Sequence, residues 1–393
     1  MSPFATAPMR SLLDASYKAK QPETDADVWC LNLDQIESHS GKVLSKLKVT
    51  ARDVGPSTYA FEKGTVLYCK LRPYLNKVVV ADADGMATTE LVPLRCDASK
   101  VLPDYLAHFL RSPSFLAFAT NVVAGAKMPR MVMGEFWAYP VPLPPLEEQR
   151  RIAAILDQAE TLRTQRRQAL AHLDTLTQSL FLDMFGDVEA EGWLIETIAG
   201  VAHPDKGSMR TGPFGSQLLH SEFVEEGIAV LGIDNAVANE FRWGERRFIS
   251  EAKYRDLKRY TVKPGDVLIT IMGTCGRCAV VPDDILVAIN TKHLCCITLN
   301  KQKCRPEFLH AYFLRHPMAR KYLAQTAKGA VMDGLNMGLI QAMPIPVPPL
   351  SLQQTFATRI QAIEPLKATH RTALAQLDAL FASLQQRAFA GEL

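Results

Sequence analysis

The residues in this sequence best suited to chemistry are cysteines. Five of the eight lie between positions 275 and 304, beginning with a Cys-x-x-Cys pair: Cys275, Cys278, Cys295, Cys296 and Cys304. Four thiolates can hold a tetrahedral zinc ion, and a Cys-x-x-Cys pair can be redox-active. However, the adjacent Cys295 and Cys296 fit poorly as two ligands of one zinc knuckle. The pattern therefore favours small buried thiols and predicts no metal site.

The common catalytic signatures are missing from the chain. It contains no G-x-x-x-x-G-K-[ST] phosphate loop, no G-x-G-x-x-G, no G-x-S-x-G and no H-E-x-x-H. It also lacks the Asn-Pro-Pro-aromatic and Asp-Pro-Pro-Tyr segments that hold a flipped base for amino-methylation. Together these absences predict a chain that is not itself an enzyme.

Cations, small residues and amides gather in segments that suit contact with nucleic acid. Glycine-rich loops approach phosphates through backbone N–H groups, Arg and Lys read guanine, and Asn reads adenine. The candidate DNA-contact residues are Lys70, Arg72, Tyr74, Lys77, Lys127, Arg130, Thr211, Ser216, Arg277, Lys292, His293, Lys328 and Asn336. The alternative for any single loop is an ordinary tight turn, and a lone histidine such as His293 is more often structural.

The distribution of charge agrees with two contact regions. The chain has 44 Lys and Arg against 41 Asp and Glu, a net charge of only +3. Basic residues nevertheless concentrate in two segments, 42–77 and 242–263. Two such segments on a nearly neutral chain suggest two footprints on a polyanion, although two solvated faces would look the same.

Composition and length place the chain among globular proteins. Of its 393 residues, 48% are hydrophobic and 22% charged, and the length suits two or three domains. No apolar run reaches the roughly 18 to 20 residues that span a bilayer, and the first residues do not resemble a secretion signal. We expect a cytoplasmic protein with free thiols.

The sequence contains an internal repeat, so the elements that would position the contact residues occur twice. Pro142-Leu143-Pro144-Pro145-Leu146 returns as Pro346-Val347-Pro348-Pro349-Leu350, and Gln149 returns as Gln353, both at an offset of 204. The same offset relates Leu173-Asp174-Thr175-Leu176 to Leu377-Asp378-Ala379-Leu380. A register that holds over this whole stretch predicts a pseudo-dimer: globular unit, helix, globular unit, helix.

Each proline-rich segment precedes a long predicted helix. Apolar residues at alternating steps of three and four predict a heptad seam that packs one helix against the other. The seam residues are Ile152, Ile155, Leu162, Leu173, Leu176 and Leu180 in the first helix and Phe356, Ile363, Leu366, Leu377, Leu380 and Leu384 in the second. Arg166 and His370 occupy matching seam positions, where a polar pair can set the register unless both side chains point outward. Pro365 should kink or break the second helix after Glu364.

The globular units have the pattern of a mixed α+β fold. Short strands are predicted at 65–69, 78–81, 267–271 and 294–299, with one helix per unit near 105–118 and 308–323. The predicted division is 1–145 for the first globular domain, 146–187 for the central helix, 188–349 for the second domain and 350–393 for the C-terminal helix.

The two Pro-x-Pro-Pro-Leu segments leading into long helices resemble the specificity subunit of type I restriction-modification systems. The segment Glu147-Glu148-Gln149-Arg150-Arg151-Ile152-Ala153 follows the first copy. The segments 71–77, 212–216 and 263–268 are similar to that family's target recognition domains. The resemblance covers nearly the whole chain, and the helical regions are its most specific part.

The resemblance implies a fold and a function. It implies two mixed α/β target recognition domains separated by two long antiparallel coiled-coil helices, each domain binding half of a bipartite, asymmetric DNA target. The helices would dock two methyltransferase subunits and, where present, restriction subunits. It also implies no cofactor in this chain, with S-adenosylmethionine, ATP and Mg on the partner subunits. The alternative is a coiled-coil scaffold that binds only proteins.

Overall fold

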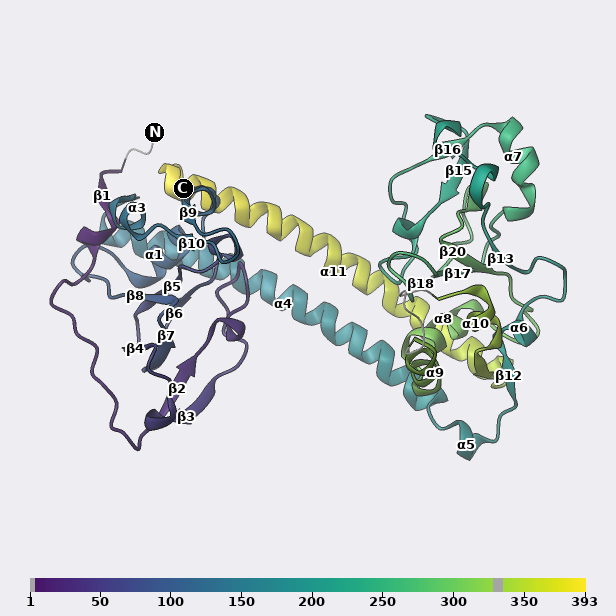
Figure 1. Cartoon of the computed structure of the whole chain (residues 1–393), viewed down its shortest axis with the longest axis horizontal. Coiled ribbons are helices and arrows are strands. Elements are labelled where there is room, and N and C mark those ends of the chain that lie inside the picture. The colour runs from purple at the N-terminus through teal and green to yellow at the C-terminus, as the bar shows by residue number, and fades with distance from the viewer. Residues whose placement is uncertain (1–3, 328–334) are drawn as a thin grey trace. The chain divides into compact units, whose positions relative to one another are not determined.

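The computed structural model describes residues 4–327 and 335–393, and the chain divides into two compact units. Unit 1 comprises Met1–Gln168 and His370–Leu393, and unit 2 comprises Ala169–Thr369. The division falls inside both long helices, α4 (Leu146–Phe185) and α11 (Leu350–Ala390), so that each unit contains part of each helix (Figure 1). No helix in the described residues is both long enough and apolar enough to cross a membrane.

Unit 1 is built from small sheets and short helices. Its described strands are β1 (Thr6–Pro8), β2 (Asp27–Leu31), β3 (Leu47–Thr50), β4 (Thr58–Phe61), β5 (Val66–Cys69), β6 (Val78–Val80), β7 (Gly85–Thr88), β8 (Leu91–Leu94), β9 (Val123–Ala124), β10 (Arg130–Met131) and β11 (Pro140–Pro142). Its short helices are α1 (Pro103–Leu110), α2 (Pro113–Asn121) and α3 (Met133–Ala138). The sheet orders are β3-β2-β7-β4, β6-β5-β8, β1-β11 and β10-β9.

Unit 2 repeats this plan with additions. Its described strands are β12 (Ile195–Thr197), β13 (Met209–Thr211), β14 (Phe223–Val224), β15 (Ile228–Leu231), β16 (Phe248–Ile249), β17 (Val267–Thr270), β18 (Cys278–Val280), β19 (Ala288–Asn290), β20 (Leu294–Ile297) and β21 (Pro344–Pro346). Its helices are α5 (Val188–Glu191), α6 (Ile198–Val201), α7 (Glu251–Leu257), α8 (Pro306–Arg315), α9 (Pro317–Ala327) and α10 (Met337–Ala342). The sheet orders are β13-β20-β17-β18, β14-β16-β15-β19 and β12-β21.

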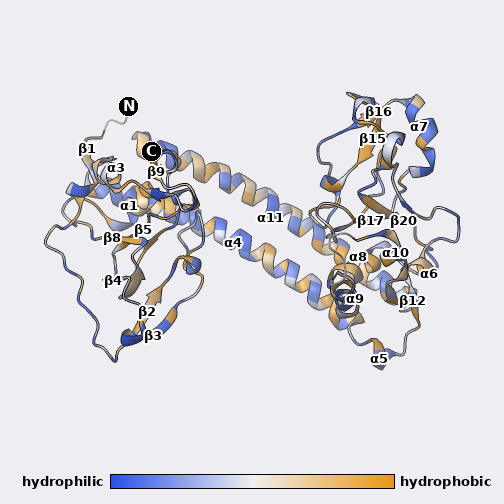
Figure 2. Ribbon diagram, viewed as in Figure 1, coloured by the Kyte–Doolittle hydropathy of each residue, from blue (hydrophilic) through white to orange (hydrophobic). Residues whose placement is uncertain are grey.

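The central strands are buried on both faces, which explains their unbroken apolar runs. In β5, Val66 and Tyr68 pack into the cluster that contains α1, and Leu67 and Cys69 pack against the neighbouring sheet. Strand β17 does the same in unit 2. Figure 2 shows hydrophobic residues in the strands of both units and a mixture of hydrophilic and hydrophobic residues along α4 and α11. The predicted mixed fold with two long helices is confirmed.

The prediction of one helix after the strands of each unit is wrong, because two helices occupy each segment. In unit 1 the break falls between α1 and α2 at Pro113, and in unit 2 it falls between α8 and α9 at Pro317. Proline cannot donate an N–H within a helix and favours the first helical position, so each proline starts a new helix.

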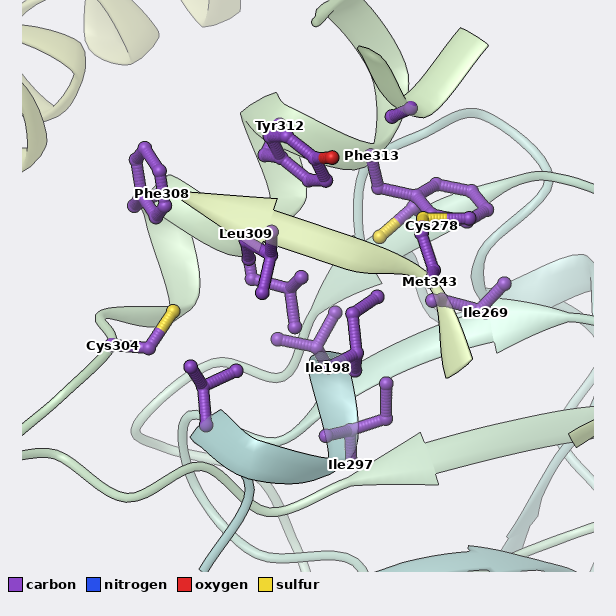
Figure 3. Close-up of a cluster of buried hydrophobic side chains, with 14 of the residues drawn as sticks. Ile198, Ile269, Cys278, Ile297, Cys304, Phe308, Leu309, Tyr312, Phe313 and Met343 are labelled. Carbon is purple, nitrogen blue, oxygen red and sulfur yellow. The ribbon is translucent and has the colours of Figure 1, made fainter. Parts of the chain in front are cut away.

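The ends of the long helices are part of the two hydrophobic cores. Phe181 and Phe185 from α4 and Phe356 from α11 belong to the unit 2 core. Figure 3 shows this core around Phe308 and Tyr312 of α8. In unit 1 the corresponding region contains Ile152 and Leu156 of α4 with Ala388 and Phe389 of α11. Within each unit, therefore, the beginning of one long helix lies beside the end of the other, and the two helices are antiparallel.

The prediction of a continuous apolar seam is wrong in four places. Leu162 is 41% exposed, Leu176 51%, Leu366 53% and Leu380 49%. Of the other seam residues, Ile152, Phe356 and Ile363 are buried, while Ile155, Leu173, Leu180, Leu377 and Leu384 are half-buried. The heptad pattern assumes that a helix buries one face only, whereas these helices pack partly against globular cores. Two other fully buried side chains, Leu156 and Phe181, are therefore shifted by one position from the predicted stripe.

Ion pairs hold the two long helices together where the seam is open. In unit 1, Arg163 of α4 binds Glu160 on its own helix and Asp378 of α11, with 2.6 Å between Arg163 Nε and Asp378 Oδ1. In unit 2, Lys367 of α11 binds Glu364 on its own helix and Asp174 of α4, 2.8 Å away. The repeat offset relates all three partners in one unit to their counterparts in the other. The predicted contact of Arg166 with His370 also forms, at 3.2 Å.

The sequence predicted that Pro365 would either kink or break the second helix, and it does not break it. Helix α11 continues through it to Ala390. A proline inside a helix removes one backbone hydrogen bond. The buried Ile363 and Lys367 on either side anchor this part of the helix within unit 2 and offset that loss.

The glutamine that lies three residues after each Pro-x-Pro-Pro-Leu segment makes the same hydrogen bonds in both copies. Gln353 Oε1 accepts from the backbone N–H of Arg305 at 2.8 Å, and its Nε2 donates to the carbonyls of Lys303 and Pro348. Gln149 makes the same three kinds of bond in unit 1, to Leu102, Lys100 and Pro144. Each side chain thus joins the start of a long helix to the loop before α8 or α1.

We expect Gln353→Ala to lower the free energy of unfolding of unit 2 by about 3 kcal/mol, because it removes three hydrogen bonds to buried or part-buried backbone groups. Gln353 is fully buried, whereas its neighbour Gln354 is exposed on the same helix. Gln354→Ala should change stability by less than about 0.5 kcal/mol. Urea unfolding followed by circular dichroism measures both, and equal effects of the two substitutions would contradict the assignment.

Candidate nucleic-acid interface

Two equivalent loops carry five of the thirteen predicted contact residues, and most of the others lie in segments beside these loops. Loop A, residues 70–77, joins β5 to β6, and loop B, residues 271–277, joins β17 to β18. The two strand pairs have the same antiparallel pairing within their sheets. Corresponding ends of the two units therefore bear loops of nearly equal length.

Loop A lies against the β9–β10 hairpin, which brings together two segments that are remote in the sequence. The backbone N–H of Arg72 donates to the carbonyl of Pro129 at 2.7 Å, and Leu71 forms an isolated bridge with Arg130. Arg72 and Asn76 both have φ of 49°, in the left-handed region. This tight backbone leaves Arg72 and Tyr74 exposed on the same loop.

The predicted residues of unit 1 divide into engaged and available side chains. Lys77 Nζ donates to the carbonyl of Leu33 at 2.6 Å, and Arg130 forms an ion pair with Glu90 at 2.8 Å. In contrast, Lys70, Arg72 and Lys127 make no side-chain hydrogen bond or ion pair with the described part of the chain, and Arg72 and Lys127 are exposed. Those two cations are the strongest candidates for contact with phosphates or base edges in unit 1.

Loop B lies beside two further loops at the same end of its sheet. The register places Thr211 opposite Cys295, Thr270 opposite Leu294 and Ile269 opposite Cys278. The segments that leave these strand ends are 212–217, 291–293 and loop B. A Cβ at Gly212 would lie 2.0 Å from the carbonyl oxygen of Asn290, so only glycine permits this close approach.

The structure brings Thr211, Ser216, Arg277, Lys292 and His293 to this end of the sheet. Ser216 and Arg277 are exposed, and the other three are half-exposed. Burial, with the nearby Lys292 and Arg247, lowers the pKa of His293. The imidazole is therefore neutral at pH 7 and offers one donor and one acceptor.

The remaining two predicted residues have different outcomes. Lys328 lies outside the described residues. Asn336 caps α10, where its Oδ1 accepts from the backbone N–H of Leu339 at 2.9 Å. A Cβ at Gly276 would lie 3.9 Å from Leu335, so the start of α10 is next to loop B.

Exposed apolar side chains also lie near both loops. Tyr74 and Met128 are 43% and 46% exposed in unit 1, and Phe214 and Met272 are 48% and 38% exposed in unit 2. Of these, only Tyr74 was a predicted contact. Placement beside exposed cations is what distinguishes the other three from core residues, and a single sequence carries no local signal for it.

The buried cysteines are poorly suited to hold a metal ion. Cys278, Cys295, Cys296 and Cys304 are buried, and burial raises the pKa of each thiol, to about 12 for Cys295 and Cys304. Protonated thiols are poor ligands and poor nucleophiles. Within the described residues, no group of three or more Cys, His, Asp or Glu side chains is placed to bind a metal ion.

Comparison with known proteins identifies the family. The family model described as "Type I restriction modification DNA specificity domain" matches residues 56–172 and 233–379. The chain is 31% identical over 188 residues to the type I restriction enzyme EcoDI specificity subunit of Escherichia coli, a match that covers 47% of this chain and 41% of that protein. It is 24% identical over 286 residues to the EcoBI specificity subunit of the same organism, covering 64% and 58%. These matched stretches span about half the length of the two relatives.

The same fold occurs in a solved structure. The S subunit of a type I restriction-modification system from M. genitalium superposes with a TM-score of 0.60 at 14% identity. That alignment covers 98% of this chain and 96% of the other. At this identity the likeness supports the fold and not the details of a site.

Proposed function

Because the chain belongs to the type I restriction modification DNA specificity domain family, we propose that it is the DNA specificity subunit of such a system. In this proposal unit 1 reads one half of a bipartite target and unit 2 reads the other half. The observation that carries it is that corresponding sheet ends of the two units bear loops with cations, Arg72 and Lys127 in one and Arg277 and Lys292 in the other. The loops differ in sequence, so the target should be asymmetric.

The proposed division of labour follows from the chemistry of the loops. Lysine and arginine side chains contact phosphates, which supplies most of the affinity and makes binding weaken steeply with salt. Bidentate contacts from arginine or asparagine to base edges supply specificity. The chain itself is proposed to bind no cofactor, with S-adenosylmethionine on methyltransferase subunits and ATP and Mg on restriction subunits.

The exposed leucines support docking of two like partners. In unit 1, Leu162 and Leu380 lie at the level of the Arg163–Asp378 ion pair, and in unit 2, Leu366 and Leu176 lie at the level of the Lys367–Asp174 pair. The repeat offset relates Leu162 to Leu366 and Leu176 to Leu380. An apolar surface presented twice with the same composition suits two copies of one subunit, which we propose to be the methyltransferase.

The proposal is tested by co-expressing the chain with its methyltransferase subunit and mapping methylated adenines by long-read sequencing. We expect a split, asymmetric motif. The double substitution Arg72→Ala and Lys127→Ala should weaken or relax one half-site, and Arg277→Ala with Lys292→Ala should affect the other. Each lost phosphate contact should lower the salt slope of DNA binding by about 0.9, and each lost base contact should cost roughly 1 to 3 kcal/mol.

Two lysines provide matched controls, because they lie at the opposite ends of the same strands. Lys63 precedes β5 and Lys263 precedes β17, and both side chains are exposed. Lys63→Ala and Lys263→Ala should leave the motif and the salt slope unchanged. A stable complex whose motif ignores both double substitutions would favour the protein-binding scaffold instead.

A further inference from the structure

Hydrogen bonds connect one histidine to the end of each loop, and the proposed function gives these two histidines no role. His108 is on α1 of unit 1 and is 2% exposed, and His310 is half-buried on α8 of unit 2. Burial lowers the pKa of both, that of His310 to about 4. Both imidazoles are therefore neutral at pH 7, and their neighbours fix which ring nitrogen carries the proton.

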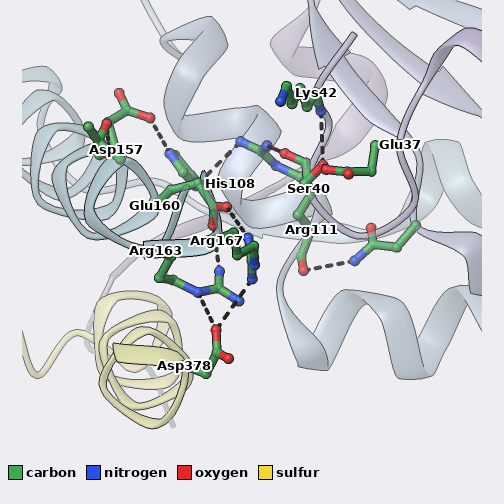
Figure 4. A network of polar contacts seen from close by, with 12 residues as sticks. Glu37, Ser40, Lys42, His108, Arg111, Asp157, Glu160, Arg163, Arg167 and Asp378 are labelled. Carbon is green, nitrogen blue, oxygen red and sulfur yellow. Dashed lines mark hydrogen bonds and ion pairs between the residues drawn. The ribbon is translucent and has the colours of Figure 1, made fainter. Parts of the chain in front are cut away.

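His108 connects α4 to the helix that supports loop A. Its Nε2 lies 2.7 Å from Asp157 Oδ1, and its Nδ1 lies 3.5 Å from Arg111 Nη2 (Figure 4). A carboxylate only accepts and a guanidinium only donates, so Nε2–H donates to Asp157 and Nδ1 accepts from Arg111. This tautomer holds Arg111 at the end of α1.

Arg111 in turn binds loop A directly and also binds the turn at Ser40, which itself contacts loop A. Its carbonyl accepts from Asn76 Nδ2 at 3.1 Å, and its Nη1 donates to the carbonyl of Ser40 at 2.6 Å. The backbone N–H of His39, beside Ser40, donates to the carbonyls of Leu75 and Asn76. A Cβ at Gly41 would lie 2.6 Å from Arg111 Nη1, so this turn packs directly on the guanidinium. The end of loop A is thus fixed from two sides.

His310 fixes the end of loop B more directly. Its Nε2 lies 3.1 Å from the carbonyl oxygen of Cys278 and 2.9 Å from that of Asn239. Two acceptors require that Nε2 carry the proton. Asn239 Oδ1 also accepts from the backbone N–H of Cys278 at 3.2 Å, and Cys278 follows Arg277, the last residue of loop B.

The two arrangements share a device but not a sequence position. Each uses a histidine on the first helix after the strands and an asparagine with positive φ, Asn76 at 49° and Asn239 at 57°. His108 and His310 do not match in the register that relates the long helices, because the repeat offset would pair His108 with Tyr312. Each loop therefore has its own support, built from residues of its own unit.

We propose that His108 and His310 are positioning residues, each of which sets the geometry of one recognition loop and hence the specificity of one half-site. The inference rests on the proposed function and adds which residue of each unit positions its recognition loop. Neither histidine contacts DNA. Each acts through the backbone of its loop, because a displaced loop moves Arg72 or Arg277 out of reach of its base or phosphate.

The test uses the full chain in its methyltransferase complex, with methylation mapped across a genome. His108→Ala should lower the discrimination at one half-site about tenfold while the other half-site and the gap stay unchanged, since one well-placed base contact is worth about that factor. His310→Ala should do the same at the opposite half-site. Each variant is the control for the other.

Conservative variants separate positioning from a general loss of structure. Glutamine can donate from Nε2 as both histidines do, so His108→Gln and His310→Gln should restore most of the discrimination. Asn76→Gly keeps the backbone conformation but deletes the side-chain bond from loop A to the carbonyl of Arg111. Asn239→Gly likewise deletes the bond from the backbone N–H of Cys278 to Asn239 Oδ1, while both hydrogen bonds of His310 remain. These two variants decide the question if an alanine variant does not fold. They should repeat the single half-site effects.

The outcomes distinguish this inference from the proposed function. If a histidine or asparagine variant degrades both half-sites equally, or lowers methylation with the motif intact, these residues are merely structural and the inference is wrong. If the unaltered chain directs no split motif at all, the proposed function fails first. Thermal unfolding of each variant reports whether a general loss of stability accompanies the change.

Discussion

Removing one heptad from each long helix should abolish methylation at the native target and create a new target with the same two half-sites and a shorter gap. The deletions are residues 165–171 in α4 and 369–375 in α11, which are equivalent positions in the internal repeat. Seven helical residues rise about 10.5 Å, close to three base-pair steps of about 3.4 Å. The expected change is therefore a gap shorter by about three base pairs.

The deletions are chosen so that the shortest ion pair between the helices in each unit remains, although the weaker Arg167–Asp378 pair and the Arg166–His370 contact are lost. Arg163 with Asp378 in unit 1 and Lys367 with Asp174 in unit 2 all lie outside the deleted segments. Long-read sequencing of methylated DNA from cells that carry the variant and its methyltransferase reads the motif directly. An unchanged gap, or half-sites with different bases, would show that helix length does not set the spacing.

A single deletion provides the control. Removing 165–171 from α4 alone leaves α11 one heptad too long, so the two helices can no longer satisfy both sets of contacts. We expect this variant to direct no defined motif. A normal motif from the single deletion would argue that the two helices do not act as a matched pair.

Phe185→Ala should be the most destabilising single substitution described for unit 2. Phe185 is fully buried. The centroid of its ring lies 4.9 Å from that of Phe308, 5.2 Å from that of Phe181 and 5.5 Å from that of Phe356. Deleting a buried phenylalanine side chain costs about 3 to 5 kcal/mol in lost transfer energy and an unfilled cavity. The expected result is a lower denaturant midpoint for unit 2, measured by urea unfolding.

Two substitutions define the specificity of this effect. Phe389, the repeat counterpart of Phe185, packs against Tyr105 and Phe109 in unit 1, so Phe389→Ala should destabilise unit 1 instead. Leu176→Ala, on the same helix as Phe185 but 51% exposed, should change stability by less than about 0.5 kcal/mol.

If Leu176 docks a partner, its loss should weaken assembly with the methyltransferase while leaving stability unchanged. Equal destabilisation by Phe185→Ala and Leu176→Ala would contradict the observed packing.

Several features of the fold could be predicted because their causes are local or repeated. The buried strands β5 and β17 are short apolar runs between turn residues, and this pattern depends only on neighbouring residues. The doubled chain plan follows from one offset that pairs Gln149 with Gln353 and Asp174 with Asp378. The structure gives these repeated residues the same hydrogen bonds or ion pairs in both units. The possible contact residues could also be predicted, from their residue types and from the loop segments in which they lie.

The tertiary structure alone decided which of those residues are available and which faces of the helices are open. Arg130 and Lys77 look like Arg72 and Lys127 in the sequence, but Glu90 and the carbonyl of Leu33 occupy them. Leu162 and Leu176 fit an apolar seam by spacing, yet they are exposed because α4 packs against globular cores as well as against α11. The supports of loops A and B join His108 to Asp157 and His310 to Asn239, across 49 and 71 residues. Periodicity reports only neighbours along one element, so contacts between elements, which depend on how the whole chain packs, leave no mark in it.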